Sequence, residues 1–253
     1  MSDEPNAQPA STPITAARAL EVLEQGQVQT EHGLMRYSSN YTFLVTVKFA
    51  DVEIMAIYKP QKGERPLWDF PDGTLCYREC AAFLTSHELG WDLVPPTVLR
   101  EGPRGLGSVQ FFIDHDPQLN YFTFDANLIP QLMVMALFDY VVNNADRKGG
   151  HCLLDAQGHL WGIDHGITFH ALPKLRTVIW DFAGQPVPDR LLADLDTLCG
   201  KLDDPQNRFH RSLSRLLSDA EVAAFQARIR KVLRARVFPQ PGHSGPNYPW
   251  PPV

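Results

Sequence analysis

The sequence predicts an α+β fold of two lobes, with a small β-rich lobe first and a mainly helical lobe after it. Two observations carry this prediction. The runs 41–49 and 53–59 are strand-like and flank a short turn, as in a β-hairpin. After residue 117, apolar residues return mainly at helical spacing. The 253 residues are 44% hydrophobic and 21% charged, which allows a substantial core and excludes disorder of the whole chain.

The chain divides into four parts. Residues 1–12 are polar, small and Pro-containing, so we expect a disordered tail. We place the first lobe at residues 13–116 and the second at residues 117–238. Residues 239–253 hold too much Pro and Gly for a helix and are expected to form an extended Pro-rich tail.

In the first lobe, Ile14–Gln25 has the apolar spacing of a helix and ends at Gly26. Further strands are expected at 97–100 and 108–113, and a helix at 79–90. In the second lobe, Ser218 followed by Glu221 is the capping-box pattern of a helix start. We expect helices at 127–143, 188–201, 209–217 and 218–236, and a short hairpin of 152–154 and 160–163 around the turn 155–158.

Two aspartates lie at the two ends of that short hairpin. Asp146 precedes it and Asp164 follows it, so folding of the hairpin brings both together. Phosphoryl transfer needs one carboxylate to accept the proton of the attacking hydroxyl and another to hold Mg²⁺ against the phosphates. Asp146 suits the first role and Asp164 the second. Ordinary turn residues are the alternative interpretation of both positions.

A lysine and a glutamate in the first lobe strengthen the catalytic interpretation. Lys59 ends the second strand of the long hairpin, and Glu79 follows twenty residues later in a predicted helix. In kinases a Lys–Glu pair of this kind positions the lysine on the nucleotide phosphates. The alternatives are a surface lysine at a strand end and a glutamate favoured by the helix dipole.

The metal positions differ from the protein-kinase pattern. In that pattern an Asn that binds a second metal ion follows the catalytic Asp by five residues, and here that residue is His151. Asp164-His165-Gly166 stands where protein kinases have Asp-Phe-Gly. A neutral imidazole favours softer metals than Mg²⁺, so the pair His151 and Asp164 favours Mn²⁺ or a single weak metal site.

Other segments are candidates for nucleotide contacts. Ser38, Ser39 and Asn40 can bind phosphates through backbone N–H and hydroxyl groups, or form a plain polar turn. Gln110 and Phe112 belong to the last strand before the crossover, where an adenine ring finds backbone hydrogen bonds. A plain core strand is the alternative there.

Residues 60–75 form a long loop, rich in Pro, Trp, Phe, Asp and Gly, between Lys59 and Glu79. Loops of this length are often functional. In one interpretation, the loop covers the nucleotide or contacts a substrate through Glu64, Arg65, Trp68 and Asp69. In the other, Trp68 and Phe70 pack it as a lid that supports the following helix.

Several motifs together resemble a bacterial family related to phosphatidylinositol 3- and 4-kinases, and the similarity covers nearly all of residues 15–235. They are Ser38-Ser-Asn-Tyr-Thr-Phe-Leu-Val45, Tyr58-Lys-Pro60, the segment 63–75, Arg78-Glu79, Asn144-Ala-Asp-Arg147 and Ile163-Asp-His-Gly166. The resemblance implies a two-lobed, protein-kinase-like fold.

By position, the resemblance implies that Lys59 binds phosphates and Glu79 anchors it. Asp146 would be the catalytic carboxylate, Arg147 beside it in the catalytic loop a further catalytic residue, and Asp164 a metal ligand. The expected function is therefore an ATP-dependent phosphotransferase that uses ATP with Mg²⁺ or Mn²⁺. Its acceptor, an inositol compound, another small molecule or a protein, is left open, because related folds act on different acceptors.

Two other functions stay open at this point. A nucleotide-binding pseudokinase is favoured by His151 in place of Asn. A metal-dependent hydrolase would use His151, Asp164, His165 and His170 as zinc ligands, but it leaves Lys59 and Glu79 without a role.

Charge and cysteine usage bound the partners and the compartment. The formal net charge of −6 argues against nonspecific binding of nucleic acid or anionic membranes. A basic cluster at 228–236 is interpreted as a solvated helix face in preference to a lipid site. The four cysteines show no paired CxxC pattern, and no leader-like or membrane-spanning apolar run is found. We therefore expect a cytoplasmic protein.

Overall fold

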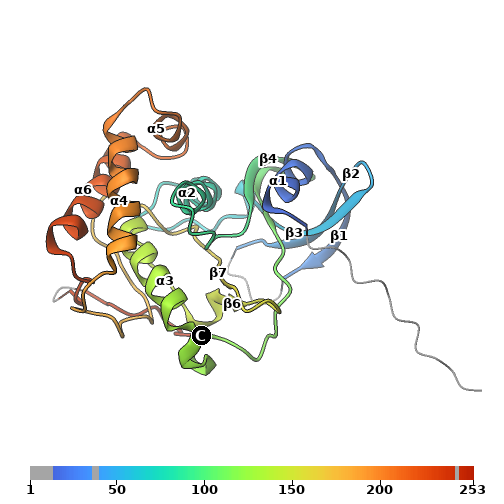
Figure 1. The fold of residues 1–253 in the computed structure, drawn as a ribbon. Coiled ribbons are helices and arrows are strands. Elements are labelled where there is room, and N and C mark those ends of the chain that lie inside the picture. Colours follow the sequence, from blue (N-terminus) through green and yellow to red (C-terminus); the bar gives the residue numbers. More distant parts are fainter. Residues whose placement is uncertain (1–13, 36–39, 243–244) are drawn as a thin grey trace, which may run out of the picture.

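The computed structural model describes residues 14–35, 40–242 and 245–253. It confirms the predicted α+β arrangement of two lobes, one built on a five-stranded sheet and the other mainly helical (Figure 1). The predicted tail at residues 1–12 lies outside the described residues. The lobe limits 13–116 and 117–238 stay predictions.

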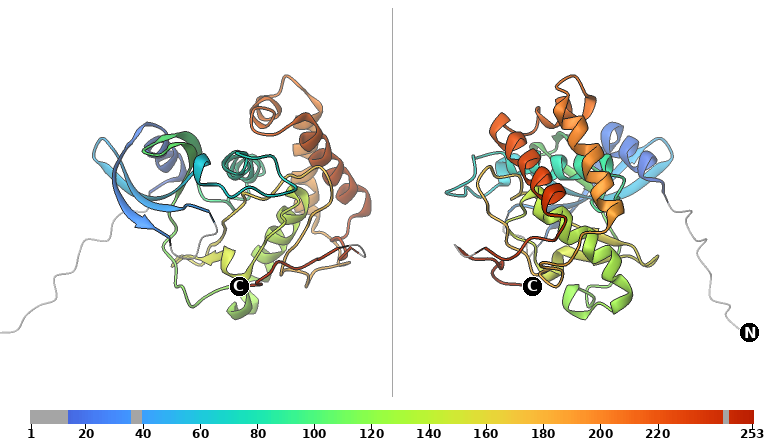
Figure 2. Two further views of the ribbon diagram at one scale, coloured as in Figure 1. Left: turned by 180° about the vertical axis from the view of Figure 1, so that it is seen from behind. Right: turned by 60° about the vertical axis from the view of Figure 1, so that its left-hand side comes forward.

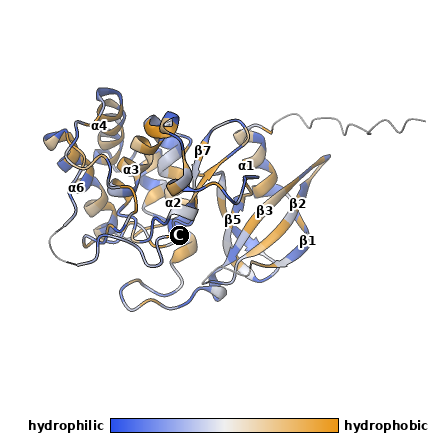
Figure 3. Cartoon of the chain, turned by 90° about the horizontal axis from the view of Figure 1, so that it is seen from below, coloured by the Kyte–Doolittle hydropathy of each residue, from blue (hydrophilic) through white to orange (hydrophobic). Residues whose placement is uncertain are grey.

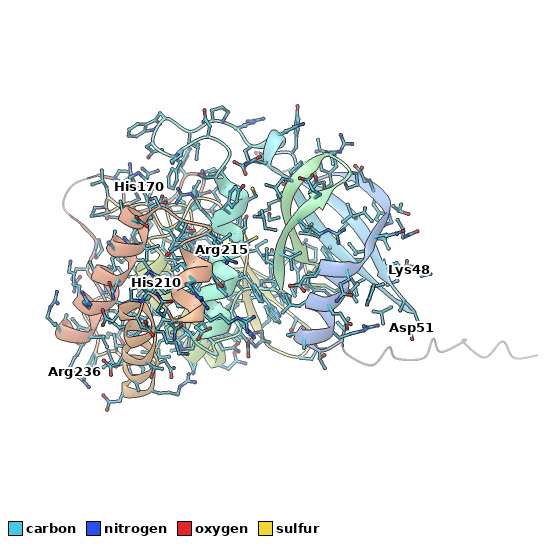
Figure 4. The ribbon with its side chains drawn as sticks, turned by 90° about the horizontal axis from the view of Figure 1, so that it is seen from above. Lys48, Asp51, His170, His210, Arg215 and Arg236 are labelled. Atoms are coloured by element: carbon cyan, nitrogen blue, oxygen red, sulfur yellow. The ribbon has the colours of Figure 1, made fainter. Side chains whose placement is uncertain are left out.

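The sheet of the first lobe is antiparallel throughout, with the strand order β1-β2-β3-β5-β4. The long hairpin 41–49/53–59 is confirmed, and its turn places Ala50 in the left-handed region with φ 54°. Figure 4 shows Lys48 and Asp51 at this turn, at the end of the first lobe that faces away from the second lobe. The strands are β1 (Gln27–Leu34), β2 (Phe43–Phe49), β3 (Val52–Pro60), β4 (Thr97–Gly102) and β5 (Gly105–Phe111).

Helix α1 (Ala16–Gln25) covers part of the sheet, as predicted, and Thr15 caps its first turn by accepting a hydrogen bond from the Arg18 N–H. Its Val22 and Leu23 are completely buried and pack in one apolar cluster with inward-facing residues of β2 and β3. Burial of these side chains on both elements fixes which face of the sheet is internal.

Helix α2 (Leu75–Glu88) lies between the sheet and the C-terminal helices (Figures 1 and 2). It begins four residues before the predicted start at Glu79, because the Glu64 carboxylate accepts hydrogen bonds from the Leu75 and Cys76 N–H groups at 3.0 and 2.8 Å. A side chain eleven residues away thus satisfies the free N–H groups of the first turn. Arg78 anchors α2 to the second lobe through the Thr168 carbonyl at 2.6 Å.

In the second lobe, α3, α4 and α6 stand together on the side away from the sheet (Figure 3). The capping box of α6 is confirmed, with Ser218 and Glu221 exchanging hydrogen bonds. The short hairpin is confirmed, and Asp155 accepts hydrogen bonds from two N–H groups of its turn. The elements are α3 (Ile129–Val142), β6 (Cys152–Leu154), β7 (Leu160–Gly162), α4 (Asp189–Asp203), α5 (Arg208–Leu213) and α6 (Asp219–Ala235), with 3-10 turns η1 (Gln61–Gly63), η2 (Tyr121–Thr123), η3 (Ala126–Leu128) and η4 (Gly149–His151).

The C-terminal segment returns from α6 across the second lobe and ends near the short hairpin (Figure 1). The Asn247 carbonyl accepts a hydrogen bond from the Thr177 N–H at 3.1 Å, and the Pro252 carbonyl accepts one from the Gly149 N–H at 2.8 Å. The described part of the predicted Pro-rich tail is thus docked on the body of the protein. Among the described residues, none of the helices has the length and apolar character needed to cross a bilayer.

Candidate functional site

The centre of the candidate site joins three elements that are distant in the sequence. Lys59, at the end of β3, forms an ion pair with Glu79 of α2, and its Nζ lies 2.9 Å from Oδ1 of Asp164, which follows β7. The other carboxylate oxygen of Glu79 accepts a hydrogen bond from the His165 N–H at 2.9 Å. The structure therefore brings together Lys59, Glu79 and Asp164 as the sequence predicts.

The charges of this centre stabilise one another. Burial alone would lower the pKa of Lys59, but the carboxylates of Asp164 and Glu79 outweigh it and hold that pKa above its ordinary value. Lys59 in turn holds the pKa of Asp164 well below its usual range. Asp164 has a left-handed backbone with φ 61°, a conformation found at functional sites more often than elsewhere. The ammonium group of Lys59 therefore lies between the side chains of Glu79 and Asp164.

Asp146 follows α3 on a short loop whose shape is fixed from within. Its N–H donates to the Asn144 side-chain oxygen at 3.0 Å, and its carboxylate pairs with Lys148 at 3.2 Å. Burial raises the pKa of Asp146 to about 6, while Lys148 opposes the rise. A carboxylate with a pKa near neutrality suits a general base.

His151 lies between the two aspartates. Its Nδ1 is 3.0 Å from the Asp146 carbonyl oxygen and its Nε2 is 3.4 Å from Oδ2 of Asp164. Burial lowers the pKa of His151 to about 4, so the ring is neutral at pH 7. Nδ1 then carries the proton that it donates to the carbonyl, and the lone pair of Nε2 faces a carboxylate oxygen. Nε2 of His151 and Oδ2 of Asp164 could therefore ligate the same cation.

Arg147 corrects one expectation. Its side chain and that of Asp139 on α3 are both completely buried and are joined at 2.9 Å. The five N–H donors of the guanidinium meet five acceptors: both Asp139 oxygens, the carbonyls of His151 and Ile163, and Nε2 of His165. No donor remains for a substrate. Arg147 is therefore a positioning residue, and the prediction that it is catalytic is wrong in this geometry.

The proposed zinc ligands of the hydrolase alternative do not assemble. His165 is completely buried, and its Nε2 accepts from Arg147 at 2.7 Å. Nε2 of His170 forms a hydrogen bond with the Asp69 carbonyl, and its Nδ1 accepts a hydrogen bond from the Leu172 N–H. Within the described ranges, no three His, Cys, Asp or Glu side chains are grouped to hold a metal ion. Of the four proposed zinc ligands, only His151 and Asp164 have ligand atoms that face each other, at 3.4 Å.

The residues predicted to contact the nucleotide are only partly within the described part of the chain. Ser38 and Ser39 lie outside the described residues, and the Asn40 side chain accepts a hydrogen bond from the Arg65 N–H at 2.8 Å. Gln110 lies in β5, which is paired on both sides, and its side chain donates to Thr97 at 2.8 Å. The Phe112 N–H donates to the Met55 carbonyl at 3.1 Å. The Gln110 side chain and the Phe112 N–H are thus both engaged in hydrogen bonds inside the first lobe, and their predicted contact with an adenine ring stays a prediction.

The 60–75 loop supports the following helix and also contacts the segment after the short hairpin. Glu64 caps α2, and Phe70 is buried against His170 and Arg78, which agrees with a supporting lid. Asp69 pairs with Lys174 at 2.7 Å and so connects the loop to the segment after the hairpin. Trp68 is 90% exposed and does not pack the lid.

The positioning roles of Asp139, Lys148 and Glu64 were missed by the sequence analysis. Asp139 is polar in an otherwise apolar helix face, which is a signal for a buried ion pair. Glu64 gives no signal, because a loop glutamate that caps a distant helix has no fixed spacing.

Comparisons with known proteins relate part of this chain to phosphatidylinositol kinases. Residues 101–218 match the family model of phosphatidylinositol 3- and 4-kinase. Phosphatidylinositol 4-kinase gamma 4 of Oryza sativa subsp. japonica is 27% identical over 207 residues, which cover 70% of this chain and 36% of that protein. Among solved structures, the Helicobacter pylori proinflammatory kinase CtkA has a TM-score of 0.49 and 12% identity, covering 85% of this chain and 94% of that one.

A bacterial relative aligns over most of its length. Protein Rv2133c of Mycobacterium tuberculosis (strain ATCC 25618 / H37Rv) is 37% identical over 265 residues, and the alignment covers 91% of this chain and 94% of the relative. Together with the kinase family model, this match confirms the resemblance seen in the motifs. The chain belongs to a bacterial family that includes Protein Rv2133c and is related to the phosphatidylinositol 3- and 4-kinases.

Proposed function

We propose that this protein is an ATP-dependent phosphotransferase that transfers the γ-phosphoryl group to a hydroxyl group of an acceptor. The observation that carries the proposal is the connected centre in which Lys59 contacts both Glu79 and Asp164. In kinases, a lysine ammonium group held by carboxylates from two different elements binds the nucleotide phosphates.

Each residue has a role in the proposed reaction. Lys59 neutralises phosphate charge, and Glu79 holds its ammonium group in place. Asp146 accepts the proton of the acceptor hydroxyl as that oxygen bonds to the γ-phosphorus. The bond between the γ-phosphorus and the β,γ-bridging oxygen breaks, and ADP leaves with its electron pair. The pKa of Asp146 at about 6 keeps most of the base ionised at neutral pH.

A divalent cation fits the residues present. Asp164 supplies a carboxylate and His151 a neutral imidazole nitrogen, and their ligand atoms face each other at 3.4 Å. Mg²⁺ in such sites is held by one or two protein groups together with the phosphates, and imidazole shifts the preference toward Mn²⁺. When bound, the ion neutralises charge on the phosphates.

A pseudokinase is the second candidate, and His151 is the observation that favours it. A site with one weak metal position binds nucleotide yet transfers phosphate slowly or not at all. The two candidates share the nucleotide-binding residues and differ in the turnover of bound ATP.

The nucleotide site is tested by equilibrium binding of ATP with Mn²⁺ or Mg²⁺ to the wild type, Lys59→Met and Asp164→Asn, and the transfer reaction is tested by turnover of labelled ATP. Lys62→Met is the matched control, because Lys62 is exposed and lies three residues after Lys59. We expect metal-dependent binding that the Lys62 variant keeps and that the Lys59 and Asp164 variants weaken at least about tenfold. Equal binding by all four folded proteins would contradict the proposed site.

A further inference from the structure

A pocket large enough for a small molecule lies apart from the Lys59 centre. It is a pocket of about 730 Å³ on the helical lobe. Its walls are the segment 173–176 with Trp180, the last turns of α6, and residues 237–240, 242 and 245–247 of the C-terminal segment. None of the residues Lys59, Glu79, Asp146 and Asp164 lines it. We call it the tail pocket, and its volume is that of a site for a small molecule.

The tail pocket is positively charged. Lys174, Arg176 and Lys231 line it, and no Asp or Glu is among its lining residues in the described chain. Lys174 is already engaged, since its Nζ pairs with Asp69 at 2.7 Å and lies 4.8 Å from the centre of the Trp68 ring. Within the described residues, the side chains of Arg176 and Lys231 make no hydrogen bond or ion pair. Two cations are therefore free to meet an anion.

The remaining walls are largely apolar and aromatic. Tyr140, Trp180, Val232 and Phe238 line the pocket together with several prolines. The Trp180 ring is held in place because its Nε1–H donates to the Asn247 carbonyl at 3.1 Å. Fixed aromatic walls beside free cations are complementary to a molecule that has both an apolar body and an acidic group.

The C-terminal segment makes this a built site. The Asn247 carbonyl accepts hydrogen bonds from both the Thr177 N–H and the Trp180 side chain, each at 3.1 Å. The Asn247 side chain also exchanges hydrogen bonds with the Gly242 backbone at 2.9 and 2.8 Å. These bonds hold the wall formed by residues 245–247 against the segment that carries Arg176.

We propose that the tail pocket binds a soluble anionic amphiphile, a small molecule with an aromatic or acyl body and a phosphate, sulfonate or carboxylate group. Arg176 and Lys231 bind the acidic group, and the ring of Trp180 contacts the body. The pocket adjoins the catalytic loop, because the Arg176 N–H donates to the Asn144 carbonyl at 2.9 Å and the Arg176 carbonyl accepts from the Arg147 N–H at 3.0 Å. The proposal concerns binding alone and does not depend on the proposed transfer reaction.

The test is a fluorescence titration of the full chain with 8-anilinonaphthalene-1-sulfonate, compared with 1-anilinonaphthalene, which has the same rings without the charge. We expect one saturable site that binds the sulfonate at least about tenfold more tightly than the neutral compound. Hexyl phosphate should displace the sulfonate, whereas inorganic phosphate at the same concentration should not. Equal affinity for the two ring compounds, or displacement by inorganic phosphate alone, would overturn the proposal.

Variants locate the binding. The double variant Arg176→Ala/Lys231→Ala should weaken the sulfonate about tenfold, whereas Arg190→Ala/Arg234→Ala, which removes two exposed arginines outside the pocket, should not. Ala235→Trp fills the pocket from its lining and should abolish binding while circular dichroism shows an unchanged fold. Equal binding by the two double variants, or by the filled variant, would assign the probe to another surface.

Discussion

Replacement of Arg147 by Ala separates a positioning role from a catalytic one. The Arg147 and Asp139 side chains are both completely buried, and the guanidinium gives all five donors to protein acceptors. Among the described residues, Arg147→Ala leaves the buried Asp139 carboxylate with only the Asn144 amide as a partner, at 2.9 Å. Removing one partner of a buried ion pair costs about 3 to 5 kcal/mol. That is a large share of the roughly 5 to 15 kcal/mol that stabilises a typical domain.

Urea denaturation followed by tryptophan fluorescence measures this cost. Arg147→Ala should shift the unfolding midpoint strongly downward, whereas Arg190→Ala, which changes an exposed arginine of α4, should change the free energy of unfolding by less than about 0.5 kcal/mol. The double variant Asp139→Asn/Arg147→Met should recover part of the loss, because no buried charge is left unpaired. If Arg147→Ala unfolded at the wild-type urea concentration and lost only phosphate transfer, Arg147 would be catalytic and our interpretation would fail.

Four further outcomes are expected. Glu79→Gln should lower the transfer rate roughly a hundredfold in single-turnover measurements, since Lys59 loses the carboxylate that anchors it; an unchanged rate would disprove the anchoring role. Because Asp146 acts as a base only when ionised, kcat/KM should fall about tenfold per pH unit below about pH 6 and stay level above it, and a flat profile from pH 4.5 to 8 would speak against this base. His151→Asn should lower the ratio of Mn²⁺- to Mg²⁺-supported rates, and an unaltered ratio would remove His151 from the metal site. Ser218→Ala should lower the free energy of unfolding by about 1 kcal/mol, because α6 loses its N-terminal cap. An unchanged urea midpoint would contradict this role of Ser218.

Sequence patterns predicted most of the fold where apolar spacing is regular. The β2–β3 hairpin, the β6–β7 hairpin and the capping box of α6 all follow local rules and were confirmed. Strand β1 was missed because it is an exposed edge strand with polar residues and two register irregularities, so no apolar alternation marks it. The start of α2 was missed because Glu64 caps it from the preceding loop.

The site was predictable to the extent that chemistry and order identify it. Lys59, Glu79 and Asp164 meet as their kinase-like order indicated. The role of Arg147 could not be predicted, because an Asp-Arg pair in a loop gives no sign that the arginine points inward to Asp139. The position of the C-terminal segment could not be predicted from local sequence patterns either. It depends on backbone hydrogen bonds between residues that are far apart in the sequence, such as Gly149 and Pro252.

Phosphate transfer from ATP is the central claim, and labelled ATP tests it most directly. The folded wild type and Asp146→Asn would be incubated with α-labelled or γ-labelled ATP and Mn²⁺ or Mg²⁺, and both bound and released label would be followed. We expect metal-dependent release or transfer of the γ-label only, and we expect Asp146→Asn to lose it although that variant still binds ATP. Transfer of the α-label would contradict phosphoryl transfer, and absence of metal-dependent ATP binding by the wild type would contradict the kinase site itself.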